Sequence, residues 1–105
     1  DIINADILEK LNTSAMIINV GRGTAINEED LSDALNGGKI AAAALDTTKI
    51  EPLDADSSLW TAKNCFISAH DSAHSLLSLE RAFKLFFQNL KNIKNGNQII
   101  NLYKE

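Results

Sequence analysis

The segment Met16-Ile-Ile-Asn-Val-Gly-Arg22-Gly23 decides the predicted fold. It is a short, mostly apolar run that ends at a glycine and is followed at once by an arginine. Apolar runs of this kind are typical of strands in parallel sheets, which are buried on both faces. We therefore predict a buried strand over residues 16–20, with Arg22 just beyond its carboxyl end.

Two further apolar runs predict strands over residues 40–45 and 65–69. Between the first two strands, Asn27 and three acidic residues open a helix that ends at Gly37-Gly38. The spacing of apolar side chains predicts a long helix over residues 75–94. The expected fold class is therefore α/β, a partial Rossmann-like parallel sheet of about three strands with flanking helices and a long C-terminal helix.

Four polar residues lie at or beyond the predicted strand ends: Arg22, Asp46, Glu51 and His70. The carboxyl ends of parallel strands converge on the crevice where α/β proteins bind ligands. Arginine can hold a carboxylate through two hydrogen bonds, histidine can move a proton near neutral pH, and glutamate can favour the imidazolium form. These residue types are suited to a small 2-oxo or 2-hydroxy acid.

An ordered series of motifs extends over most of the chain and carries a family resemblance. The chain resembles the C-terminal part of the NAD-binding domain of the D-isomer-specific 2-hydroxyacid dehydrogenases. The motifs are Asn4-Ala5-Asp6-Ile7-Leu8, Ile18-Asn19-Val20-Gly21-Arg22-Gly23, Gly38-Lys39-Ile40-Ala41, Ala44-Leu45-Asp46, Glu51-Pro52-Leu53, Leu59-Trp60, Asn64 and His70.

The resemblance implies an oxidoreductase that transfers hydride between NAD(P) and a small D-2-hydroxy acid or 2-oxo acid. It assigns Arg22 to the substrate carboxylate and the C2 oxygen, His70 to acid/base chemistry, and Glu51 to pairing with His70. The implied cofactor is NAD, with NADP left open. The cofactor-binding residues that it implies are Val20, Gly21, Arg22, Asp46, His70, Ser72 and Ala73.

The chain departs from the family pattern around His70. Ala69 stands where the family usually has proline, and Asp71 places a negative charge beside the histidine. Thr47-Thr48 follows Asp46 where Val-Phe is usual. These changes affect substrate preference and the nicotinamide-side contacts rather than the four key residues.

No Gly-x-Gly-x-x-Gly phosphate cradle occurs in the sequence. We therefore expect a piece of a longer protein. Residues 1–74 would be the C-terminal half of a dinucleotide-binding domain, and residues 75–105 a return helix and tail toward a substrate domain. The isolated piece is expected to be inactive.

Composition narrows the remaining options. The net charge is −4, with no basic cluster typical of nucleic-acid binding, and no apolar run reaches bilayer-spanning length. The single Cys65 cannot form an internal disulfide, which fits a cytoplasmic protein. The sequence leaves the oligomeric state open, a homodimer being one option for the longer protein.

Two alternatives remain at this point. His70 and His74 have the spacing of the two histidines in the zinc-hydrolase pattern, which requires both on one helix. No third ligand is evident, so no metal site is predicted. A non-catalytic, NAD-regulated binding protein of the same fold is the other alternative.

Overall fold

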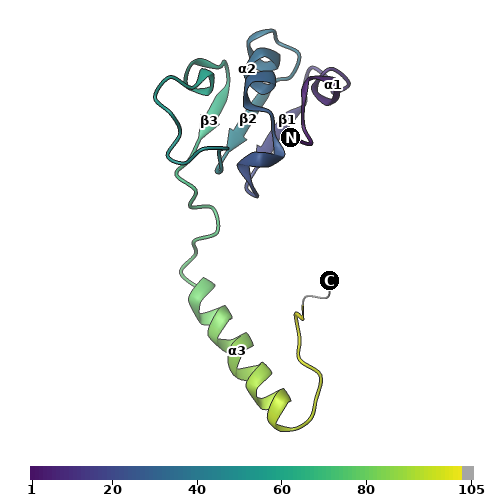
Figure 1. Cartoon of the computed structure of the whole chain (residues 1–105), viewed down its shortest axis with the longest axis vertical. Helices are drawn as coiled ribbons and strands as arrows, with labels where there is room; N and C mark the ends of the chain where they lie inside the picture. Colours follow the sequence, from purple (N-terminus) through teal and green to yellow (C-terminus); the bar gives the residue numbers. More distant parts are fainter. Residues whose placement is uncertain (103–105) are drawn as a thin grey trace. The chain divides into compact units, whose positions relative to one another are not determined.

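The computed structural model of the chain describes residues 1–102. Contacts divide the chain into two compact units, Asp1–Ser72 and Ala73–Glu105. The first unit carries the sheet and the short helices, and the second carries one long helix (Figure 1). In chain order the elements are α1 (Ala5–Leu8), β1 (Met16–Asn19), the 3-10 helix η1 (Gly23–Ala25), α2 (Glu28–Asn36), β2 (Ala42–Leu45), the 3-10 helix η2 (Ser58–Thr61), β3 (Cys65–Ile67) and α3 (Ser78–Lys94).

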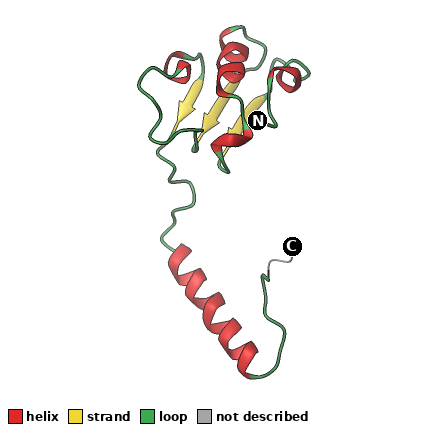
Figure 2. Cartoon of the chain, viewed as in Figure 1, coloured by secondary structure: helices red, strands yellow, loops and turns green. Residues whose placement is uncertain are grey.

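The sheet has three parallel strands in the order β1-β2-β3, which confirms the predicted α/β class (Figure 2). The register aligns Ile18 with Ala44 and Ala44 with Phe66. Each strand is shorter than predicted, since β1 and β3 end earlier and β2 begins later than the apolar runs indicate. His70 therefore lies three residues beyond the end of β3 rather than directly after it.

Helix α2 begins and ends as its sequence predicts. The side chain of Asn27 accepts hydrogen bonds from the backbone N–H groups of Glu29 and Asp30, which caps the first turn. After the helix, Gly38 has a φ of +68°, a conformation that glycine adopts without steric cost. Leu31 and Leu35 lie on the buried face of α2 and tie it to the sheet.

The hydrophobic core lies on one face of the sheet only. Ala43 and Leu45 of β2 point into it and are each 2% exposed. Ile18 and Phe66, on the opposite face, are 69% and 68% exposed. The expectation that the strands are buried on both faces is thus wrong within the described residues, because only one face is covered.

The second unit contains α3, which begins at Ser78 instead of residue 75 and is followed by Gly96 at a φ of +68°. Asn89 exchanges two hydrogen bonds with the backbone of Ile100, so the chain after the helix folds back along it. The apolar side chains of α3 follow the helical spacing that the sequence predicts, but no residue of α3 is buried. Among residues 1–102, no helix has the length and apolar character needed to cross a membrane.

Candidate active site

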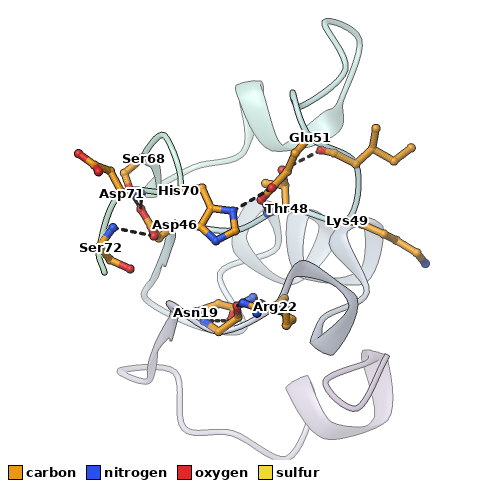
Figure 3. Close-up of polar contacts among 12 residues, drawn as sticks. Asn19, Arg22, Asp46, Thr48, Lys49, Glu51, Ser68, His70, Asp71 and Ser72 are labelled. Carbon is orange, nitrogen blue, oxygen red and sulfur yellow. Dashed lines mark hydrogen bonds and ion pairs between the residues drawn. The ribbon is translucent and has the colours of Figure 1, made fainter. Parts of the chain in front are cut away.

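The loop after β1 is fixed by a buried asparagine. Asn19, which is 9% exposed, donates through Nδ2 to the carbonyl of Arg22 at 3.0 Å. Its Oδ1 accepts from the N–H of Gly21 at 3.1 Å. Hydrogen bonds from the buried side chain of Asn19 therefore fix the backbone around Arg22. The exposed guanidinium of Arg22 donates to the carbonyl of Gly21 at 2.8 Å (Figure 3).

At Gly23 the loop after β1 approaches the backbone of the loop after β2 closely. A Cβ atom built on Gly23 would lie 2.0 Å from the backbone carbon of Thr48 and 2.4 Å from the nitrogen of Lys49. A glycine allows close approach to the backbone, either by a ligand or by another part of the chain. At Gly23 the close neighbour is the chain's own backbone.

Glu51 and His70 form the ion pair at the centre of the site. Nδ1 of His70 lies 2.8 Å from Oε2 of Glu51, and Oε1 of Glu51 accepts from the N–H of Thr48 at 3.1 Å (Figure 3). Both side chains of the pair are half-exposed. The hydrogen bond from His70, followed by that from Thr48, lowers the pKa of Glu51 below its usual value. The carboxylate thus stays ionised and orients the imidazole.

Asp46 holds the loop that carries His70. Its Oδ1 accepts from the hydroxyl of Ser68 at 2.6 Å and from the N–H of Asp71 at 2.9 Å. Its Oδ2 accepts from the N–H of Ser72 at 2.9 Å. The hydroxyl of Ser68 is the first cause of a pKa for Asp46 well below the ordinary aspartate range.

Sequence reasoning missed Asn19 and Ser68. Asn19 falls inside a predicted buried strand, and a polar residue within an otherwise apolar run is the signal available for it. Ser68 stands two residues before His70, but a lone serine carries no specific signal. Arg22, Asp46, Glu51 and His70, which the sequence singled out, all lie at the carboxyl edge of the sheet.

An open pocket of about 590 Å³ adjoins the ion pair. Apolar and polar side chains share its wall, a composition typical of small-molecule sites. Another hollow, of about 520 Å³, is lined largely by acidic residues of α2 and the loop after β2, and Asp46 and His70 do not line it. Arg22 lines neither of these two hollows. The pocket beside the ion pair is lined by Asp46, Thr48, Glu51, Pro52, Leu53, Trp60, Ile67, Ser68, Ala69 and His70.

The structure removes the premise of the zinc alternative. That pattern needs His70 and His74 on one helix, whereas β3 ends at Ile67 and α3 begins at Ser78. Within the described part of the chain, no three His, Cys, Asp or Glu side chains gather closely enough to hold a metal ion.

Residues 1–72 match the model of the D-isomer specific 2-hydroxyacid dehydrogenase NAD-binding domain. The chain belongs to this family. The matched segment contains the sheet and all of the loops described above, and the predicted resemblance is confirmed.

Individual family members agree with this assignment. A hydroxypyruvate reductase from Blautia hydrogenotrophica is 39% identical over 98 residues, which cover 93% of this chain and 30% of the relative. The human glyoxylate reductase/hydroxypyruvate reductase is 48% identical over 67 residues, covering 64% of this chain and 20% of the relative. The chain thus spans about a third or less of the length of these relatives.

Solved structures of the family share the fold. A D-isomer specific 2-hydroxyacid dehydrogenase from Xanthobacter autotrophicus Py2, in complex with NADPH and MES, has a TM-score of 0.84 at 32% identity; the match covers 98% of this chain and 42% of that one. An NADPH-dependent glyoxylate/hydroxypyruvate reductase from Sinorhizobium meliloti, in complex with NADP and sulfate, also has a TM-score of 0.84, at 26% identity over 98% of this chain and 34% of that one.

Replacing Gly23 with alanine is expected to destabilise the family domain. The new methyl group would overlap the backbone of Thr48, so the loops after β1 and β2 would have to separate. We expect a loss of about 3 kcal/mol or more in the free energy of unfolding. Urea denaturation measures the change.

Gly21→Ala is the matched control, because its Cβ would lie 3.6 Å from Oδ1 of Asn19, an ordinary contact. Its effect should stay within about 0.5 kcal/mol. Equal losses from both variants would contradict the role given to Gly23.

His70→Ala is expected to raise the pKa of Glu51 toward its usual value of 4.5. The variant removes the hydrogen bond that contributes most to the lowered value. Because the pKa is lowered in the folded state, the stabilisation from this pair is present above pH 4.5 and is lost as the pH falls through the lowered value. Carbon-13 NMR titration of the Glu51 carboxyl group measures its pKa in the variant and in the unaltered protein.

Glu9 supplies the internal control for that titration. Its pKa is also lowered, by the hydrogen bond and charge of Lys39 at 2.6 Å. It should not respond to His70→Ala. A Glu51 pKa unchanged by the variant would show that His70 does not stabilise the carboxylate.

Proposed function

We propose that the chain is part of a longer NAD(P)-dependent oxidoreductase that interconverts a small D-2-hydroxy acid and the matching 2-oxo acid. The observation that carries the proposal is the Glu51–His70 pair at 2.8 Å, on the sheet edge that also bears Arg22. Family membership supplies the reaction class. Several relatives are named glyoxylate or hydroxypyruvate reductases, so 2-oxo acids of this size are the proposed substrates.

Each of the three side chains has a distinct proposed role. Arg22 holds the substrate carboxylate through its guanidinium and polarises the C2 oxygen. Because Nδ1 of His70 faces Glu51, Nε2 is the nitrogen that gives a proton to the carbonyl oxygen in reduction and takes it back in oxidation. Glu51 orients the ring and stabilises the imidazolium that forms in oxidation.

The described residues fit the nicotinamide end of the cofactor. NAD(P) would supply or accept the hydride. Val20, Gly21 and Arg22 are all exposed just past β1, so this segment is open to a ligand at the carboxyl edge of the sheet. The carboxylate of Asp46 already accepts three hydrogen bonds, which leaves it limited capacity for a further one. The proposed cofactor-binding set is Val20, Gly21, Arg22, Asp46, His70, Ser72 and Ala73.

We also propose a cytoplasmic location and a domain division near residue 74, with residues 75–105 forming a return helix and tail toward a substrate domain. The cysteine content supports the location, since the single Cys65 cannot form an internal disulfide. The boundary in the sequence between the two compact units, after Ser72, supports the division.

Arg22→Lys should lower the kcat/KM of the longer protein for glyoxylate or hydroxypyruvate by about 10- to 100-fold. Lysine keeps the charge but loses the two-pronged hydrogen bonding, which corresponds to the loss of about one charge-assisted hydrogen bond. Steady-state oxidation of NADH or NADPH measures the rate.

Arg81→Lys is the matched control, because Arg81 is exposed on α3 and is the only other arginine. It should leave the kinetics unchanged. Near-normal kinetics for Arg22→Lys would remove Arg22 from the substrate site. The absence of any 2-oxo acid reduction by the unaltered protein would refute the proposed function and favour a cofactor-regulated binding protein.

The 105-residue chain alone should bind NADH too weakly to detect at micromolar concentrations and should be catalytically inactive. It has the proposed catalytic residues but no phosphate cradle, so most of the cofactor-binding energy is missing. Calorimetric titration with NADH tests this expectation. Micromolar affinity would place the cofactor site elsewhere in the chain.

A further inference from the structure

The carboxylate of Asp46 is directed at the segment that carries His70. Asp46 is 4% exposed, and its three hydrogen-bond donors all belong to residues 68–72. One donor, the hydroxyl of Ser68, precedes the histidine in sequence. The other two, the N–H groups of Asp71 and Ser72, follow it (Figure 3). The carboxylate therefore bonds to the chain on both sides of His70.

The backbone of His70 needs such support. Its φ is +54°, in the left-handed region that residues with a Cβ rarely adopt. The N–H of Ser68 donates to the carbonyl of Leu45 at 2.9 Å, which continues the β2–β3 pairing by one step before the turn. Beyond the turn, the chain is held through the two N–H groups that bond to Asp46. Since Ala69 places no special restriction on its own φ, these contacts fix the turn.

We propose that Asp46 and Ser68 are positioning residues, which hold His70 in its left-handed conformation and thereby aim its imidazole at Glu51. The inference rests on the function proposed above for His70. It gives Asp46 a role within the chain that is separate from the proposed contact with the cofactor. Neither Asp46 nor Ser68 exchanges a proton with the substrate in this scheme.

The chemistry of the contact explains why an ionised carboxylate suits this position. A carboxylate only accepts hydrogen bonds, and here all three partners are donors. An asparagine would have to present its NH₂ group to at least one of these donors. The lowered pKa of Asp46 keeps it in the acceptor-only form at neutral pH.

Ser68→Ala in the longer protein is the most direct test, because it removes the hydrogen bond from the Ser68 hydroxyl to Asp46 and replaces none of the proposed catalytic residues. We expect kcat to fall about tenfold, part of the 10²- to 10⁴-fold that acid/base catalysis contributes. The dissociation constant for NADH should stay within about twofold, because none of the residues proposed to bind the cofactor is replaced. A cofactor role alone would move that constant instead.

Two further variants control for folding. Ser68→Thr keeps the hydroxyl, and its added methyl has room because Ser68 is exposed, so kcat should recover. Ser14→Ala removes an exposed hydroxyl that bonds to Asn12, and its kcat should be unchanged. An unchanged kcat in Ser68→Ala, or a weakening of NADH binding as large as the loss in kcat, would overturn the proposal.

A second measurement does not depend on activity. In Ser68→Ala the amide hydrogens of Asp71 and Ser72 should exchange faster, and the pKa of Glu51 should rise as its bond to His70 loosens; NMR measures both. If both stay unchanged, the positioning role is wrong even where the protein is an active dehydrogenase. If both change while the unaltered protein reduces no 2-oxo acid, the positioning role of Asp46 and Ser68 is supported and the proposed function is wrong.

Discussion

The parallel pairing of β1, β2 and β3 is the constraint on which the site depends. Each pairing extends one hydrogen bond past the strand ends, from the N–H of Asp46 to the carbonyl of Asn19 at 2.8 Å and from the N–H of Ser68 to the carbonyl of Leu45 at 2.9 Å. All three strands run in the same direction, so the loops that follow them leave the sheet at one edge. This direction alone brings together residues that lie far apart in the sequence.

Buried polar side chains convert that proximity into a defined geometry. Asn19 is the last residue of β1, and its side chain bonds to the backbone of the loop that follows it. Asp46 is the first residue after β2, and its side chain bonds to the backbone of the loop after β3. Burying such groups is costly unless they are hydrogen-bonded, so the loops have a strong preference for the bonded arrangement. Gly23 adds a steric condition, because only a residue without a side chain lets the first loop approach the second this closely.

The apolar surface of the chain is unevenly covered. One face of the sheet packs against the core, while Ile18 and Phe66 on the other face are exposed. Leu79, Phe83 and Phe86 of α3 are also more than half exposed. Exposed apolar surface on this scale is typical of interfaces. It agrees with a chain that spans about a third or less of the length of the two reductases compared above.

The sequence by itself determined the class of the fold, the family and the residues that meet at the sheet edge. Apolar runs predict strands, Asn27 and Gly38 mark the ends of α2, and the ordered motifs from Asn4 to His70 carry the family resemblance; these signals are local, so they can be read along one chain. The apolar runs extend beyond the paired residues of each strand, because apolar character does not show where pairing stops.

Only the tertiary structure decided how the site is held. That Asp46 bonds to Ser68, Asp71 and Ser72 depends on β2 and β3 lying side by side, which no local pattern encodes. The closeness of Gly23 to Thr48 and the left-handed turn at His70 have the same origin. The exposed sheet face also contradicted a local signal, because an apolar run records a tendency to be buried, whereas burial itself requires a covering element.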